Sequence, residues 1–214
     1  MKGQAPAGRR RGAGYRTGGR AHELWRAAPA GVVMAVALAA FPAWADAPTY
    51  RVEPSLTTAE FAVAHLGVFH QHGRFARMSG RIAYDPAVPT GRVDFDISSA
   101  SVTTGWSVRD AFVRSEAMFD AEHHPLVQFR STHLEFEGDR LARIDGDLTL
   151  RGVTRPVSFA VTHMACGREL LAGRDGCDAE AGGTIRRSDF AMDFAWPLIG
   201  DEVELRFRVT AIRE

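Results

Sequence analysis

Residues 203–212, VELRFRVTAI, alternate between apolar and polar side chains with a period of two. The apolar members share one face: Val203, Leu205, Phe207, Val209 and Ala211. Because a β-strand turns successive side chains to opposite faces, this run predicts a strand with one buried face and one solvated face. The pattern constrains the fold more than any other feature, since it recurs along the chain.

Seven further segments carry strand patterns, with turns rich in Gly, Pro and Asp between them, such as DPAVPTG and EGD. They are residues 58–66, 75–85, 92–98, 126–136, 141–150, 156–164 and 178–192. About eight antiparallel strands in succession predict an all-β fold, either a closed barrel or a sandwich. We favour the eight-stranded antiparallel barrel, because closure leaves no unpaired strand edges.

Residues 107–115, SVRDAFVRS, interrupt the strand pattern. Their apolar side chains recur at helical spacing, which predicts a short helix. Ser107 and Asp110 have the spacing of a capping box at the start of this helix. Asp110 and Arg114 are four residues apart and are therefore expected to pair across one turn.

The first 45 residues have the composition of a secretory signal. Residues 2–26 hold seven basic residues and one acid, and an apolar run of eleven follows at residues 31–41. Ala43 and Ala45 then form an A-x-A cleavage pattern. The run is too short for a permanent membrane span. We predict a cleaved signal peptide at residues 1–45 and one domain at residues 46–214, with an uncleaved membrane anchor as the alternative.

The predicted mature domain is acidic. Residues 46–214 contain 19 arginines, no lysine and 25 acids, a net charge of −6 with histidine neutral. Nucleic acid is not an expected partner, because phosphate binding requires a basic surface. No second apolar run reaches membrane-spanning length, so we expect no stable membrane insertion after cleavage.

Cys166 and Cys177 are the only cysteines in the sequence. In an exported protein an isolated pair is most simply a disulfide. The ten residues between them are glycine-rich, as a loop between neighbouring strands would be. A redox or metal-binding role is the alternative.

The sequence carries none of the short motifs that mark common enzymes or cofactor sites. G-x-S-x-G, H-E-x-x-H, the phosphate-binding G-x-x-x-x-G-K and G-x-G-x-x-G are all absent. Without a mature lysine, Schiff-base catalysis is excluded. His70 and His72 share a strand face, but two ligands fall short of the three or four that zinc requires. We therefore predict no catalytic residues, no metal and no cofactor.

Residues 109–129, RDAFVRSEAMFDAEHHPLVQF, crowd an Arg-Asp pair, three phenylalanines and a His-His dipeptide into one stretch. The segments SSASVTTGW (98–106), GDLTLRGVTRPVSF (146–159), TIRRSDFAMDF (184–194) and GDEVEL (200–205) accompany it. Together, over residues 50–213, they resemble the motifs of the YceI-like polyisoprenoid-binding family. Ala191 departs from the pattern, because the family usually has glycine there, and it requires a compatible backbone angle.

The resemblance implies an extended lipocalin-like eight-stranded barrel with a short helix, located in the bacterial periplasm. It implies a non-enzymatic carrier or sink that holds a long isoprenoid or related amphiphilic lipid, and a homodimer is possible. Each buried CH₂ contributes about 0.8 kcal/mol, so a long tail gains much from a dry interior. A small barrel can also fill its interior with side chains, and the pattern does not distinguish the two. A structural or stress-related protein with a filled core, and an enzyme acting on a hydrophobic substrate, remain the alternatives.

The strand pattern nominates ligand-binding residues in two groups. The expected apolar lining is Phe61, Val63, Phe119, Phe129, Phe159, Phe190 and Met192. The expected contacts with a polar head group are His65, Arg109, Arg187 and Ser188. For Arg109 the favoured role is a contact that, with Asp110, pins the helix to the barrel, and head-group binding is the alternative. For Arg187 the favoured role is likewise structural, the bracing of Asp189 or of a turn. The other expectations for residues 109–129 are that Phe112 and Met118 face inward, and that His123 and His124 lie in a surface turn.

Overall fold

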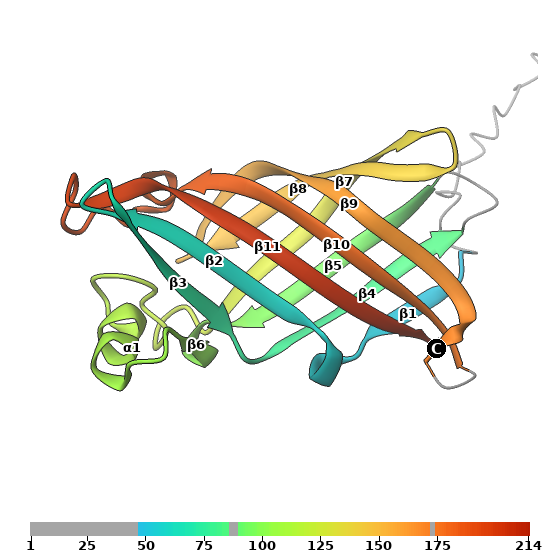
Figure 1. Ribbon diagram of the computed structural model, residues 1–214, viewed down its shortest axis with the longest axis horizontal. Coiled ribbons are helices and arrows are strands. Elements are labelled where there is room, and N and C mark those ends of the chain that lie inside the picture. The colour runs from blue at the N-terminus through green and yellow to red at the C-terminus, as the bar shows by residue number, and fades with distance from the viewer. Residues whose placement is uncertain (1–46, 86–89, 172–173) are drawn as a thin grey trace, which may run out of the picture. The chain divides into compact units, whose positions relative to one another are not determined.

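The computed structural model describes residues 47–85, 90–171 and 174–214 (Figure 1). The predicted signal peptide lies outside the described residues. The elements are β1 Thr49–Val52, the 3-10 helix η2 Pro54–Leu56, β2 Thr58–His65, β3 Phe69–Phe75, β4 Met78–Asp85, β5 Thr90–Ser98, the 3-10 helix η3 Ser99–Ser101, β6 Val102–Thr103, α1 Ser107–Arg114, β7 Leu126–Glu137, β8 Arg140–Leu150, β9 Val153–Leu171, β10 Arg174–Arg186, the 3-10 helix η4 Arg187–Phe190 and β11 Ile199–Arg213. No helix in this part of the chain is both long and apolar enough to cross a membrane.

Eight strands form a closed antiparallel ring, which confirms the predicted barrel. The order around the ring is β1-β4-β5-β7-β8-β9-β10-β11, and β1 pairs with β11 to close it. Side chains alternate between the interior and the solvent as the sequence pattern predicts. On β11, Val209 and Ala211 are buried, while Arg206 and Arg208 are exposed.

β11 pairs with two different strands on the same edge. Its last residues, from Ala211 to Arg213, pair with β1, whereas its segment from Ile199 to Arg208 pairs with β2. β3 then pairs with β2, and β6 pairs with β3. The barrel wall therefore extends beyond the eight-stranded ring at one end, where β2 and β3 continue it (Figure 1).

The strand predicted over residues 75–85 is present as β4, but its first three residues do not belong to it. β3 ends at Phe75 and β4 begins at Met78. β1, and all of β3 except Phe75, lie outside the predicted strands. β1 has only four residues, and β3 places Gln71 and Gly73 on the inward face, so neither produces the apolar alternation that marks a half-buried strand.

The predicted helix is present as α1, but its capping box is not. Trp106 is the N-cap residue, and its side chain makes no capping bond. The Asp110 carboxylate instead accepts hydrogen bonds from the Thr104 amide and hydroxyl, each at 2.6 Å, and from the Thr103 hydroxyl at 3.0 Å. These bonds hold the pKa of Asp110 below its usual value, with the Thr104 side chain as the largest cause. Asp110 therefore fastens α1 to the end of β6, and Arg114 approaches it at 4.0 Å as predicted.

The segment after α1 contains the predicted His-His turn. The His123 ring lies 2.8 Å from Asp120, is mostly exposed, and has its pKa raised by this hydrogen bond. His124 is half-buried, and its ring lies against Gly152 of the β8–β9 turn. Only His123 therefore has the exposed surface position expected for both.

The strand predicted to run through residue 192 ends at Arg186. η4 follows, and Ala191 caps it with φ 56° and ψ 35°, in the left-handed region. This conformation costs an alanine about 1–2 kcal/mol relative to right-handed backbone, whereas glycine adopts it freely. The departure of Ala191 from the family pattern therefore places a strained residue at this turn.

Ala191→Gly is expected to raise the free energy of unfolding by about 1 kcal/mol, because glycine relieves the left-handed strain at Ala191. Equilibrium unfolding in urea measures the change. Ala62→Gly, within β2 and not at positive φ, is the matched control and is expected to lose about 0.5–1 kcal/mol. Equal destabilisation by both substitutions would contradict the prediction.

The predicted disulfide is present. Cys166 and Cys177 are direct cross-strand partners on β9 and β10, with Cα atoms 4.1 Å apart. The disulfide closes the loop between these two residues. For a loop of this length the chain-entropy model gives a stabilisation of about 3 kcal/mol.

Replacing both Cys166 and Cys177 with alanine is expected to lower the free energy of unfolding by about 3 kcal/mol, because the unfolded chain regains freedom. Urea denaturation measures the loss. Thiol titration of the denatured, non-reduced wild type should find no free thiol, and two free thiols would refute the assignment.

Candidate functional site

The barrel encloses an elongated apolar cavity of about 240 Å³. Its lining comes from the inward faces of the strands and from α1 and the segment that follows it. One end is lined by Arg109, Met192 and Ile199, and the lining extends at the other end to Leu141, beside the β7–β8 turn, and to Met164 within β9. The interior is therefore hollow, which the sequence pattern had left open.

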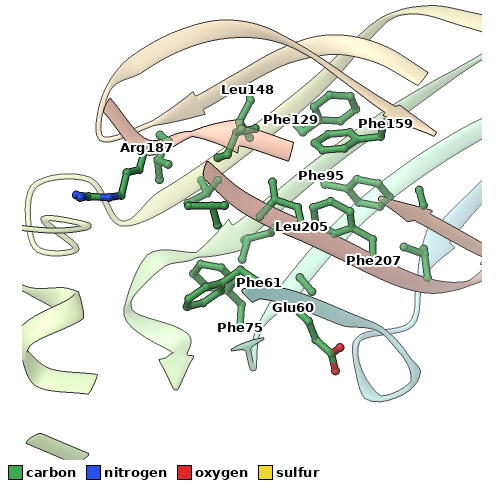
Figure 2. A pocket seen from close by; sticks show the side chains of 18 of the residues that line it. Glu60, Phe61, Phe75, Phe95, Phe129, Leu148, Phe159, Arg187, Leu205 and Phe207 are labelled. Carbon is green, nitrogen blue, oxygen red and sulfur yellow. The ribbon is translucent and has the colours of Figure 1, made fainter. Parts of the chain in front are cut away.

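Two groups of phenylalanines contribute to the cavity wall (Figure 2). The Phe159 ring centroid lies 5.3 Å from that of Phe129 and 5.2 Å from that of Phe207. The Phe75 centroid lies 5.8 Å from that of Phe61 and 5.4 Å from that of Phe119. These tilted and edge-to-face contacts stabilise the wall beyond simple area burial, by about 0.5–1.5 kcal/mol per pair.

Four of the lining phenylalanines lie against glycines of neighbouring strands. The pairs are Phe61 with Gly73, Phe95 with Gly80, Phe129 with Gly146 and Phe159 with Gly183. A Cβ atom on Gly146 would come within 2.6 Å of the Phe129 ring, and one on Gly183 within 2.9 Å of the Phe159 ring. The missing side chains give these rings room close to the wall, so the axis of the barrel stays open.

Arg109 supplies a positive charge at the end of the cavity near α1. Its guanidinium donates to the Thr104 hydroxyl at 2.8 Å, to the Thr104 carbonyl at 3.1 Å and to the Gln71 side-chain oxygen at 2.5 Å. It also lies 5.6 Å from the centre of the Trp106 ring. All three acceptors are neutral, so these contacts orient the guanidinium without neutralising its charge.

Arg187 is 2% exposed and braces the segment between η4 and β11. Its guanidinium donates to the carbonyls of Met192 at 2.6 Å, Gly200 at 2.8 Å and Ile199 at 2.9 Å. Burial lowers the pKa of Arg187 from its ordinary value. In Figure 2 the guanidinium points away from the phenylalanine cluster. The side chain of Arg187 borders the cavity, while its guanidinium N–H groups are hydrogen-bonded to backbone carbonyls.

Nine of the eleven nominated ligand-binding residues border the cavity. They are Phe61, Val63, His65, Arg109, Phe119, Phe129, Phe159, Arg187 and Met192. Ser188 and Phe190 are not among the lining residues. Ser188 is exposed and its hydroxyl donates to Asp201 at 2.8 Å, whereas Phe190 is 1% exposed within the core. Phe112 and Met118 also line the cavity, as expected.

Several lining residues were not nominated from the sequence. Phe95 and Phe207 lie on the apolar faces of alternating strands, so the pattern contained their signal. Nothing in the sequence indicated that Gln71 and Thr104 belong to the site, because each becomes part of it only through its hydrogen bond with Arg109. The neighbours His70 and His72 are exposed, while Gln71 faces the cavity.

The titratable groups of the lining are few and separate. They are Glu60, His65, Tyr84, Arg109 and Arg187. No hydrogen bond or ion pair joins two of them within the described residues, and the Glu60 carboxylate points away from the phenylalanines in Figure 2. In the same part of the chain no group of three or more His, Cys, Asp or Glu could hold a metal ion. The arrangement suits an apolar chain with a polar group at the Arg109 end.

Comparison with known proteins agrees with this architecture. A model of the YceI-like domain matches residues 50–211. A UPF0312 protein of Pseudomonas aeruginosa is 33% identical over 157 residues, which are 72% of this chain and 81% of that protein. A UPF0312 protein of Pseudomonas putida is 32% identical over 135 residues, 62% of this chain and 69% of that protein.

Solved structures show the same fold. The YceI protein of Campylobacter jejuni superimposes with a TM-score of 0.61 at 26% identity, over 71% of this chain and 90% of that one. A protein described as a polyisoprenoid binding domain from Saccharophagus degradans gives a TM-score of 0.57 at 16% identity, over 77% of this chain and 98% of that one. With a matching family model across the whole barrel, the chain belongs to the YceI-like family.

Proposed function

We propose that this protein is a non-enzymatic periplasmic binding protein that holds a long isoprenoid or related amphiphilic lipid inside its barrel, as a carrier or sink. The observation that carries the proposal is the apolar cavity of about 240 Å³, lined almost wholly by aliphatic and aromatic side chains. The likeness to a structure described as a polyisoprenoid binding domain supports the same ligand class.

Transfer of the tail from water drives binding. Each CH₂ group that leaves water contributes about 0.8 kcal/mol, so only a few carbons are needed for useful affinity. Within a preformed cavity the protein loses little conformational freedom on binding. A long, flexible hydrocarbon chain matches an elongated apolar space better than a compact polar metabolite does.

The polar end of the ligand meets Arg109. Gln71, Thr104 and His65 line the same end of the cavity. Because an arginine guanidinium is permanently charged and presents planar donors, it suits an oxygen-bearing head group such as a phosphate or a quinone carbonyl. We infer that the lipid binds with its head at this end and its tail toward Leu141 and Met164.

Two features support the proposed periplasmic location. Residues 1–45 have the composition of a cleaved signal, and the disulfide between Cys166 and Cys177 is typical of an oxidising compartment.

Mass spectrometry tests the binding proposal. The protein is exported from a bacterial host, purified without detergent, and examined by native mass spectrometry and by analysis of its organic extract. We expect a single long-chain lipid bound per barrel. Protein that carries no lipid and takes up none from polyprenyl phosphate, quinone or fatty acid would overturn the proposal.

The enzymatic alternative is separated by following the lipid itself. Unchanged ligand after prolonged incubation supports a carrier or sink. Accumulation of a chemically altered product, lost in a His65→Ala variant that still folds, would favour an enzyme.

A further inference from the structure

Exposed hydrophobic side chains gather on three segments at one end of the barrel. Of the eleven large hydrophobic residues exposed in the described part of the chain, nine lie on these segments. The β2–β3 turn contributes Leu66, Val68 and Phe69, the start and body of α1 contribute Trp106, Val108 and Phe112, and the segment before β11 contributes Phe194, Trp196 and Leu198. We call these nine residues the rim; the remaining two, Leu56 and Leu126, lie elsewhere.

The three segments are adjacent although they are far apart in the sequence. The Leu66 amide donates to the Leu198 carbonyl at 2.8 Å, which joins the β2–β3 turn to the segment before β11. The rings of Phe112 and Phe194 lie 4.9 Å apart, which joins α1 to the same segment. All three segments occur at one end of the barrel in Figure 1.

The rim is continuous with the mouth of the cavity. Phe112 lines the cavity and is also 37% exposed, and His65, beside the β2–β3 turn, likewise lines the cavity and is exposed. Arg109, which lies on α1 between the rim residues Val108 and Phe112, donates a hydrogen bond to Gln71 of β3 at this opening. An apolar ligand that enters or leaves at this end passes the rim.

The composition of the rim is that of an interfacial surface. Residues 65–72 and 194–198 contain no aspartate or glutamate, although the domain as a whole is acidic. The single acid of residues 104–112 is Asp110, which is buried with its carboxylate bonded to Thr103 and Thr104. Trp106 and Trp196 are the only tryptophans in residues 46–214, and both are exposed, at 56% and 67%. Tryptophan concentrates at membrane–water interfaces, because its ring is apolar and its N–H remains hydrated.

We propose that the rim docks the mouth of the barrel onto the interfacial layer of a phospholipid bilayer. The proposal rests on the proposed function, because a lipid ligand that is insoluble in water has to cross from a membrane to the cavity. Large exposed apolar patches mark protein or membrane contacts. Of a protein partner and a bilayer, the bilayer is favoured by continuity with the lipid cavity and by the two exposed tryptophans. Residues 65–72, 104–112 and 194–198 also present no exposed carboxylate that insertion would have to dehydrate.

Vesicle binding tests the proposal. The exported protein is mixed with vesicles of phosphatidylethanolamine and phosphatidylglycerol in equal parts, and bound protein is measured by co-sedimentation. We expect binding, together with quenching of tryptophan fluorescence by brominated lipid. The triple substitution Val68→Ser, Phe69→Ser and Trp196→Ser is expected to weaken binding at least tenfold, because these are the three most exposed hydrophobic residues.

The matched control is Leu56→Ser with Leu126→Ser, which removes exposed hydrophobic side chains outside the rim. It is expected to bind vesicles as the wild type does. No wild-type binding to vesicles, or equal binding by the rim triple variant, would overturn the proposal. A wild-type dimer in solution that the rim variant converts to a monomer would also overturn it, in favour of a second copy as the occupant.

A separate readout distinguishes the rim from the cavity. Uptake of a short, water-dispersible prenyl alcohol is followed by native mass spectrometry in the absence of vesicles. The rim variant is expected to take up this alcohol as the wild type does. Loss of vesicle binding together with normal uptake supports the proposal that the rim docks the barrel onto a bilayer. Vesicle binding by a wild-type protein that takes up no prenyl alcohol would leave the docking proposal standing and would overturn the proposed lipid-binding function instead.

Discussion

Ala181→Phe is expected to abolish lipid binding, with an affinity loss of at least a hundredfold. Ala181 lies in the middle of β10, lines the cavity, and faces Phe207 and Val161 of the neighbouring strands. A cavity of about 150 Å³ accommodates benzene, so a phenyl ring fits within the space of about 240 Å³. The ring would divide the cavity, and the loss of four or more CH₂ sites corresponds to about 3 kcal/mol or more. Titration with a polyprenyl phosphate measures the loss.

Ala160→Phe is the matched control. Ala160 lies on β9 between the inward-facing Phe159 and Val161, so its own side chain faces outward, and it is exposed. The control is expected to bind lipid as the wild type does. Wild-type affinity in folded Ala181→Phe would place the ligand outside the barrel and contradict the cavity assignment.

Arg187→Met is expected to lower the free energy of unfolding by about 3 kcal/mol or more. Methionine keeps much of the apolar stem but leaves the carbonyls of Met192, Ile199 and Gly200 without their donor. Each buried unsatisfied carbonyl costs about 1–3 kcal/mol, and solvent that reaches some of them reduces the sum. Urea denaturation measures the change, and hydrogen exchange should show lost protection in the segment between η4 and β11.

Arg186→Met changes the same residue type one position earlier. Arg186 is exposed at the end of β10, so this control is expected to alter stability by less than about 0.5 kcal/mol. Equal effects of the two substitutions would show that the backbone contacts of Arg187 contribute little. If Arg187→Met lost lipid binding while keeping wild-type stability, Arg187 would instead be a head-group ligand.

Local patterns predicted the strands that make up most of the barrel. A period of two fixes which side chains share a face, whatever lies opposite them, so Phe129, Phe159 and Val209 were correctly placed inward. β1 and β3 were not predicted. β1 is too short to show the alternation, and the inward face of β3 mixes polar and small residues. The strand predicted to run through residue 192 failed because a 3-10 turn, stabilised by the contacts of Arg187, replaces its last residues.

The candidate site was only partly predictable. The inward phenylalanines follow from alternation, but Ser188 and Phe190 lie off the cavity because η4 turns them away from the strand register. The Asp110 contacts differ from a capping box because Thr103 and Thr104, which precede the helix, fold back onto its first turn.

By itself the sequence determined which faces are apolar and that Cys166 and Cys177 form the one available pair. Through the family resemblance it also marked Ala191 as a position where glycine is usual, and the structure then showed the left-handed backbone there. Only the tertiary structure decided that the interior is hollow, that Gln71 meets Arg109, and that Leu66 meets Leu198 at the mouth. The reason is physical. Alternation is a property of neighbouring peptide units, whereas a cavity depends on how strands distant in sequence close a ring and on which rings find a glycine opposite them.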